Sequence, residues 1–217
     1  MIIAIDGGVA SGKSAVGRRV AEALVLPFVD SGLMYRAVTR LADERGIDPS
    51  DSEAVADLAR SVDLRIDGER VWADGVDLTV GIFDADHSDA LPRVSAIPGV
   101  RDALVAQQRR LGEGGVVMAG RDIGTVVFPD ADHKFFLTAN LEEKVRRRAA
   151  QYERRGERVD EAAMRREVEA RDRVDTQRAV APLRPAPDAV IIDTDQLDLD
   201  QVVDLILQHV GQGRKTR

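Results

Sequence analysis

A short apolar run followed at once by a glycine-rich segment does most to limit what this chain can fold into. Residues 2–5 read Ile-Ile-Ala-Ile, and residues 7–14 read GGVASGKS, which fits the pattern G-x-x-x-x-G-K-S. The apolar run is typical of a buried parallel strand, and apolar residues at helical spacing from Gly12 to about Leu24 predict a helix behind the loop. Strand, glycine loop and helix in this order are the context in which the pattern binds phosphate.

Each part of the loop has a physical task. Backbone N–H groups must turn inward around phosphate oxygens, which requires glycine conformations and little side-chain bulk. The predicted helix points its positive end at the same anion. We expect Lys13 to reach the β- and γ-phosphates and the Ser14 hydroxyl to ligate Mg²⁺. The residues expected to bind the nucleoside triphosphate are Gly7, Gly8, Val9, Ala10, Ser11, Gly12, Lys13, Ser14 and Ala15.

Downstream, short apolar runs alternate with amphipathic segments, which predicts a parallel sheet covered by helices on both faces. Residues 62–80, VDLRIDGERVWADGVDLTV, instead alternate apolar and polar residues around two Asp-Gly turn pairs, and predict a hairpin insertion of two or three antiparallel strands.

Ser50 is expected to cap a helix, with Glu53 completing a capping box. The highly charged segment from Leu141 to about Gln177 is expected to be helical.

Composition excludes several classes of protein. Hydrophobic residues make up 44% of the chain and charged residues 32%, an ordinary balance for a folded domain. No apolar run approaches the about 18 residues of a membrane span, and the first is too short for a signal peptide, so we expect a soluble cytoplasmic protein. The net charge of −7 and an aromatic content of 4% argue against nucleic-acid binding. With no cysteine, disulfides and thiolate chemistry are excluded.

Two arginine-bearing stretches follow predicted strands. DSGLMYR places Ser31 and Arg36 just beyond the second apolar run, at residues 26–29. AGRDIGT places Arg121 and Asp122 at the end of another apolar run, at residues 116–118. Both stretches therefore lie at the carboxyl edge of the sheet, where open α/β sheets bind ligands.

A third stretch, ARDRVDTQRAVAPL, places Arg171, Asp175 and Arg178 at i, i+4 and i+7, on one face of a predicted helix. Each stretch alone is compatible with a surface ion pair or a solvated helix residue. Together, around one phosphate-binding loop, they indicate a site for a second, anionic substrate.

The chain resembles the bacterial cytidylate kinases, the (d)CMP kinase branch of the nucleoside monophosphate kinases, from end to end. The most specific segments are GRDIGTVVFPDA and RAVAPL, and DSGLMYRA, PGVRDALVAQQR and the loop also agree. The resemblance implies a P-loop NTPase three-layer α/β fold with a central parallel sheet, a small β-rich monophosphate-binding insertion and a helical lid. The implied division is a core over 1–60, 93–143 and 177–217, an insertion over 61–92 and an arginine-rich lid over 144–176.

The resemblance also implies roles for individual residues. Arg36, Arg121 and Arg171 would hold the acceptor phosphate, and Lys13, Arg121 and Arg171 would act in catalysis. Arg101 and Asp122 would read the cytosine edge. Asp175 and Arg178 would hold the sugar, with Ser31 lining the same pocket. The arginines from Arg146 to Arg158 would either cover the ATP phosphates or form a solvated face paired with Glu142, Glu143 and Glu153.

The sequence departs from the family pattern at two positions. Gly8 stands where the family usually has proline. Pro92 stands where some relatives have a serine that touches the base, although Ser88 and Ser95 are near. The second departure leaves the discrimination of cytosine from uracil open.

The expected activity is transfer of the γ-phosphoryl group of ATP, with Mg²⁺, to CMP or dCMP, by a monomer that binds neither nucleic acid nor membranes. A phosphate monoester has a second pKa near ~6, so the acceptor oxygen is already anionic and needs no general base. A kinase of another small acceptor, such as shikimate, would explain the loop but neither the insertion nor GRDIGT and RAVAPL. A GTP-dependent switch would normally carry N-K-x-D, which the sequence lacks.

Overall fold

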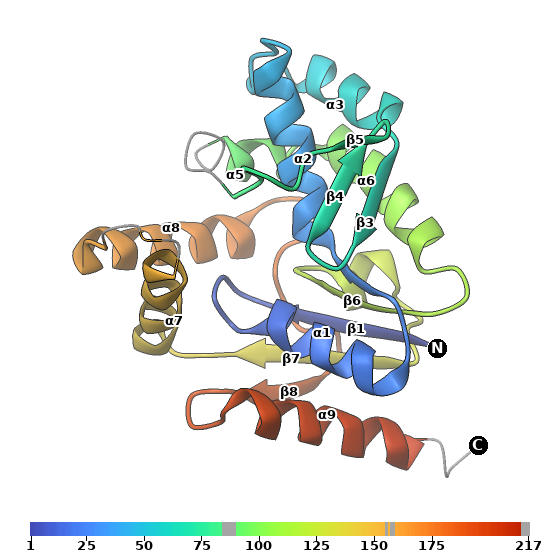
Figure 1. Ribbon diagram of the computed structural model, residues 1–217, viewed down its shortest axis with the longest axis vertical. Helices are drawn as coiled ribbons and strands as arrows, with labels where there is room; N and C mark the ends of the chain where they lie inside the picture. Colours follow the sequence, from blue (N-terminus) through green and yellow to red (C-terminus); the bar gives the residue numbers. More distant parts are fainter. Residues whose placement is uncertain (84–89, 155, 157–158, 214–217) are drawn as a thin grey trace.

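A five-stranded parallel sheet forms the centre of the computed structural model, which describes residues 1–83, 90–154, 156 and 159–213 (Figure 1). The strand order is β2-β6-β1-β7-β8, so β1, which leads into the glycine loop, is the middle strand. The strands are β1 (Ile2–Gly7), β2 (Phe28–Asp30), β6 (Val116–Gly120), β7 (His133–Thr138) and β8 (Val190–Asp193). The expected α/β class and parallel sheet are confirmed.

Alternate residues of the central strands enter two separate cores. Ile3 and Ile5 of β1 pack on one face with α1 (Lys13–Leu24) and α9 (Leu199–Gly213). Ala4 packs on the other face. Successive side chains of a strand point to opposite faces, so an all-apolar strand needs helices on both sides. The sheet is therefore the middle of three layers.

The second face is covered by helices that come from several parts of the chain. They are α2 (Ser31–Glu44), α3 (Ser52–Ser61), α5 (Leu91–Val94), α6 (Pro98–Leu111) and the π-helix η1 (Ile123–Val127). Two further helices, α7 (Leu141–Glu153) and α8 (Glu161–Gln177), stand beyond the carboxyl ends of the strands (Figure 1). We call α7 and α8 the lid.

The insertion is a three-stranded antiparallel sheet of β3 (Leu64–Asp67), β4 (Arg70–Ala73) and β5 (Val76–Asp77). Asp74 and Gly75 connect β4 to β5 with φ of +50° and +81°, the left-handed conformations that a two-residue hairpin turn of type I′ requires. Leu64 and Val71 pack into the same core as α2 and α3. The insertion is thus anchored to the sheet domain by shared apolar packing.

One local expectation needs correction. Asp51, and not Ser50, caps α3, because its carboxylate accepts from the Ala54 N–H at 3.1 Å while the Ser50 hydroxyl donates to Asp48. The charged segment after Leu141 is helical, as expected. It forms two helices, and Gly156 lies between them with φ of +78°.

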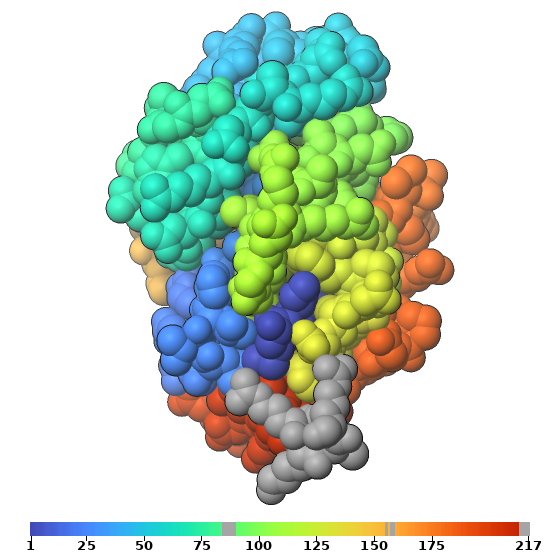
Figure 2. Space-filling model, turned by 90° about the vertical axis from the view of Figure 1, so that its right-hand side faces the viewer, coloured from blue at the N-terminus to red at the C-terminus, as the bar shows by residue number. Residues whose placement is uncertain are grey.

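The amino ends of the strands lie on the side of the molecule opposite the lid (Figure 1). Figure 2 shows the dark-blue N-terminus reaching the surface there between the segments around residues 109–115 and 128–132. The Asp132 carboxylate accepts from the Ile2 N–H at 2.8 Å and ties down the start of β1. Within the described ranges, no helix has both the length and the apolar character needed to cross a bilayer.

Candidate active site

Residues 7–14, which we call the phosphate loop, need glycine at Gly7 because of close packing and at Gly12 because of its left-handed backbone. A Cβ on Gly7 would lie 2.7 Å from the Leu137 carbonyl oxygen, and Gly12 has φ of +87° at the start of α1. The side chain of Lys13 returns over the loop, and its ammonium donates to the Gly8 carbonyl at 3.1 Å. The loop therefore presents the amino end of α1 and one cation in the same place.

Lys13 lies in an electrostatically unfavourable position when no anion is bound. Burial, followed by repulsion from Arg121, lowers the pKa of Lys13 to about 7. An anion beside the ammonium would favour its charged form and reverse this shift. The electrostatics of the loop are therefore suited to a polyphosphate.

Ser14 and Asp30 bring two oxygen ligands together beside the phosphate loop. The Ser14 hydroxyl donates to Asp30 Oδ2 at 2.5 Å, and Asp30 Oδ1 accepts from the Gly32 N–H at 2.9 Å, which caps α2. Mg²⁺ prefers hard oxygen ligands and commonly takes one or two from the protein and others from phosphates and water. Among the described residues, no group of three or more acidic or histidine side chains could hold a metal by itself. The donor set therefore fits a nucleotide-bound Mg²⁺. Asp30, the last residue of β2, was not among the residues expected to bind, although it directly precedes Ser31 in DSGLMYR.

Six residues from four segments form what we call the acceptor cluster. Asp175 of α8, with 1% of its surface exposed, accepts from Arg121 Nε at 2.7 Å and from Arg171 Nε at 3.4 Å. Burial would raise the pKa of Asp175, but Arg121 and then Arg171 hold it below the usual value. The cluster consists of Arg101, Arg121, Asp122, Arg171, Asp175 and Arg178.

The second half of the cluster centres on Asp122. Its carboxylate forms a buried ion pair with Arg101, and Arg178 Nη2 lies 3.7 Å from its other oxygen. Arg178 follows α8 with an extended backbone, so it does not continue the helical face on which Arg171 and Asp175 lie. Burial and the nearby Arg101 lower the pKa of Arg178. Four guanidinium groups thus face two carboxylates, and two positive charges remain to be balanced.

Ser31 and Arg36 lie in the first two turns of α2. The Ser31 hydroxyl donates to the Ala119 carbonyl at 3.0 Å and joins the start of α2 to the end of β6. The Arg36 guanidinium lies over the Phe83 ring of the segment after β5, 4.9 Å from its centroid. Near Pro92, the Ser95 carbonyl accepts from Arg101 at 3.0 Å and the Ser95 hydroxyl donates to the Pro92 carbonyl at 3.1 Å. Ser88 lies outside the described residues.

Two side chains of the lid form hydrogen bonds with the phosphate loop, and Val9 of the loop packs against the apolar cluster of the lid. Arg147 donates to the Ser11 carbonyl at 3.3 Å, and Asp172 Oδ1 accepts from the Val9 N–H at 3.0 Å. Asp172 Oδ2 also accepts from Lys144 at 2.6 Å. A Cβ on Gly8 would lie 2.8 Å from Asp172 Oδ1, so the absence of a side chain at Gly8 leaves room for this carboxylate.

The charged residues of the lid do not all behave alike. Arg146 is exposed and pairs with Glu143 at 2.6 Å, as a solvated helix face would, whereas Arg147 points toward the loop. Neither Lys144 nor Asp172 was expected as a site residue from the sequence, because their pairing joins two different helices. Arg155 and Arg158 lie outside the described residues.

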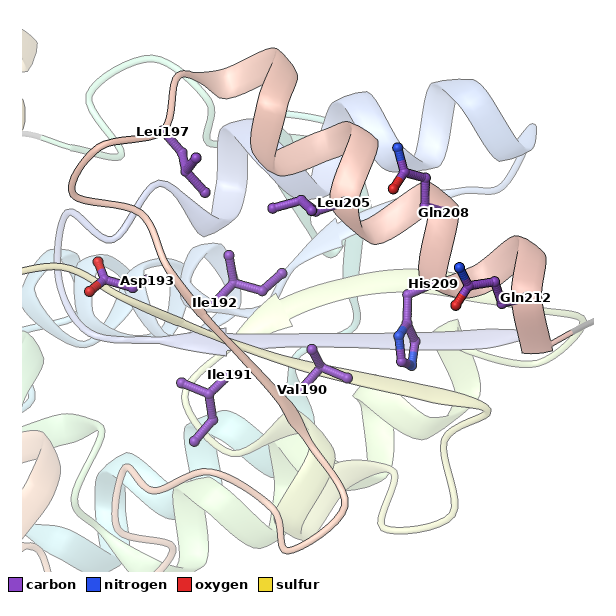
Figure 3. Close-up of a pocket in the computed structure, with 9 residues that line it drawn as sticks. All are labelled: Val190, Ile191, Ile192, Asp193, Leu197, Leu205, Gln208, His209 and Gln212. Atoms are coloured by element: carbon purple, nitrogen blue, oxygen red, sulfur yellow. The ribbon is translucent and has the colours of Figure 1, made fainter.

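A separate recess lies at the far edge of the sheet, between β8 and α9 (Figure 3). The sticks in Figure 3 show Val190–Asp193 on the strand side and Leu205, Gln208, His209 and Gln212 on the helix side. None of the residues predicted to bind nucleotide or acceptor lines it. The chemistry-bearing groups gather instead where the phosphate loop, the acceptor cluster and the lid meet.

Known proteins match nearly the whole length of this chain. A family model described as cytidylate kinase matches residues 3–212. The chain is 46% identical to a cytidylate kinase of Pelotomaculum thermopropionicum (98% of this chain, 97% of that protein) and 43% identical to one of Rhodococcus opacus (98% and 95%). It is 45% identical to a bifunctional pantoate ligase/cytidylate kinase of Synechococcus sp., of which it spans only 40%.

A solved structure shows that the fold is shared more widely. The shikimate kinase of Bacteroides thetaiotaomicron is similar with a TM-score of 0.51 at 12% identity, over 97% of this chain and 98% of that one. At this identity the likeness concerns the fold alone.

Proposed function

Because this chain belongs to the cytidylate kinase family, we propose that it transfers the γ-phosphoryl group of ATP to CMP or dCMP, giving ADP and the nucleoside diphosphate. The observation that carries the proposal is the acceptor cluster beside Lys13, with its two unbalanced positive charges. A nucleoside monophosphate carries a phosphate of up to two negative charges, which would balance them.

The arrangement divides the work between two anion sites. The phosphate loop and Lys13 would hold the donor phosphates, and Arg121 and Arg171 would hold the acceptor phosphate. Arg101 and Asp122 would contact the base, and Asp175 and Arg178 the sugar. Arg36, on α2 beside the insertion, would approach the acceptor phosphate from the other side. Since the acceptor oxygen is already anionic, catalysis would consist of alignment and charge neutralisation.

Ser14, supported by Asp30, would hold Mg²⁺ together with the donor phosphates. The ion would neutralise phosphate charge when bound. The lid would exclude water, because Arg147 and Asp172 already reach the loop that holds the phosphates. We propose that a monomer suffices, because one chain supplies every group named here.

The test is an assay of ADP release with Mg²⁺-ATP and a panel of CMP, dCMP, UMP, AMP, GMP and shikimate. We expect turnover with CMP and dCMP and little with the purine nucleotides or shikimate. Lys13→Ala should lower the rate by a factor of at least ~10² by removing the cation that neutralises phosphate charge. Equal rates with UMP and CMP would show that Arg101 and Asp122 do not distinguish cytosine from uracil. No turnover with any nucleotide would refute the proposal.

A further inference from the structure

Asp6 is a buried carboxylate that the reaction described above does not use. It lies near the end of β1, directly before the phosphate loop, and only 4% of its surface is exposed. Its Oδ1 accepts from the Ile123 N–H and its Oδ2 from the Gly124 N–H, both at 2.8 Å. Each oxygen therefore holds a backbone group of η1, while the ammonium of Lys13 donates elsewhere.

The two N–H groups need such a partner because they open a helix. The first N–H groups of a helix have no acceptor within it. A carboxylate supplies two acceptors in the geometry of two adjacent donors, which neither a hydroxyl nor an amide side chain does. The Lys134 side chain packs against the same turn, since a Cβ on Gly124 would lie only 3.2 Å from Lys134 Cδ.

The helix η1 that Asp6 binds carries part of the acceptor cluster at its start. Arg121 and Asp122 immediately precede η1, and the Asp122 carbonyl accepts from the Val126 and Val127 N–H groups at 2.9 and 3.2 Å. The backbone of Asp122 is therefore part of the first turn of η1, while its side chain pairs with arginines of the cluster. Moving η1 would move both acceptor groups.

We propose that Asp6 is a positioning residue, whose carboxylate fixes the segment that carries Arg121 and Asp122 at a set distance from the phosphate loop. The inference rests on the proposed function, because it assigns the cluster to the acceptor nucleotide. The donor loop begins one residue after Asp6, so this side chain ties the acceptor segment directly to the donor loop. Such alignment contributes strongly to the rate of an in-line transfer.

The test is Asp6→Asn, which keeps the shape of the side chain but replaces one acceptor by a donor. We expect kcat/KM for CMP to fall roughly 10- to 100-fold while the Kd for Mg²⁺-ATP stays within about twofold, because only the acceptor groups lose their support. The matched control is Asp132→Asn. That carboxylate also accepts a β1 backbone N–H at 2.8 Å, but at the opposite end of the strand, and the variant should behave like the unaltered protein.

Two further measurements keep the outcome clear. Amide hydrogen exchange at Ile123 and Gly124 should accelerate in Asp6→Asn and not in Asp132→Asn, whatever the substrate is. If Asp6→Asn does not fold, Asp6→Glu, which keeps both acceptor oxygens but lengthens the side chain under η1, should show the same selective loss toward CMP. Equal losses toward ATP and CMP, or none, would overturn the inference. Failure of the unaltered protein to phosphorylate CMP would instead overturn the proposed function.

Discussion

Single residues of this site are charged groups held out of water, and their balance depends on partners distant in sequence. Arg101 and Asp122 are nearly fully buried and pair with each other, and Asp175 lies between Arg121 and Arg171. Removing one partner of a buried pair is costly because it leaves the other charge unpaired. Conservative changes are therefore more informative at these positions than truncations.

The pKa of Asp6 makes a testable contribution to stability. Burial raises it from 3.8 to about 6, against the lowering effect of the hydrogen bonds from η1. The folded state thus binds a proton more tightly than the unfolded state. The resulting stabilisation is fully present below pH 3.8 and is lost as the pH rises through 6.

We therefore expect the free energy of unfolding of the unaltered protein to rise, relative to that of Asp6→Asn, as the pH falls from 7 to 4.5. The unaltered protein thus becomes the more stable of the two by a growing margin. The full difference between low and neutral pH would be on the order of 3 kcal/mol. Urea unfolding of both proteins at several pH values measures it. A difference that stays constant with pH would show that Asp6 does not titrate in this range.

At the scale of elements, periodicity and turn chemistry predict most of what is observed. The strand before the glycine-rich loop, the helix behind it and an Asp-Gly hairpin turn of the insertion are confirmed. The errors fall where a local signal has a nearby competitor. Ser50 and Asp51 are both good caps, and only the backbone geometry decides between them. The π-helix η1 has no sequence signal of its own, because its first N–H groups are satisfied by Asp6 on a distant strand.

The pairing of Lys144 with Asp172 predicts how the two lid helices work together. Lys144 lies on α7 and Asp172 on α8, and Asp172 also accepts from the Val9 N–H of the phosphate loop. Breaking the pair should weaken ATP binding, because the lid would lose its contact with the loop. Lys144→Gln and Asp172→Asn should each raise KM for ATP several-fold, and the double variant should be no worse than either alone.

A second, exposed ion pair joins α7 to α8 and provides the control for Lys144 and Asp172. Arg165 and Glu142 lie 3.1 Å apart with side chains 42% and 70% exposed, so their coupling should be under about 1 kcal/mol. A double-mutant cycle on each pair, read from KM for ATP, makes the comparison. Additive effects of Lys144 and Asp172 would mean that the two act independently.

At the scale of the whole molecule, the sheet separates two cores, while the lid packs around a small apolar cluster of its own. The insertion belongs to the core that also contains α2 and α3, and the lid stands at the carboxyl ends of the strands (Figure 1). The proposed nucleotide sites therefore lie between elements with different amounts of apolar support, an arrangement suited to closure around substrates.

We expect hydrogen exchange to slow in the insertion and the lid when CMP and a non-hydrolysable ATP analogue bind together. Residues 64–83, 141–154 and 161–177 should gain protection, while β1 and β6, buried in the sheet, should stay protected throughout. Mass spectrometry of peptides from each segment reads this out. CMP alone should protect the segment around Arg101, and the analogue alone the phosphate loop. Uniform protection, or none in the lid, would contradict the expected closure.

The amino-acid sequence by itself determined the fold class, the family and the location of the phosphate loop. These depend on contiguous patterns: an apolar strand, glycines at fixed spacing and a helix behind them, with GRDIGTVVFPDA and RAVAPL for the family. The roles proposed for individual site residues stay predictions, although the structure brings most of them to one place.

Only the tertiary structure decided which charges meet. Asp30 beside Ser14, Asp172 on the Val9 N–H and Asp6 under η1 each join segments that are far apart along the chain. Such a pairing cannot be predicted from a local sequence pattern, because an ion pair or a backbone hydrogen bond depends on distance in space and on burial. Both are set only when the sheet order β2-β6-β1-β7-β8 brings the carboxyl ends of its strands to one edge.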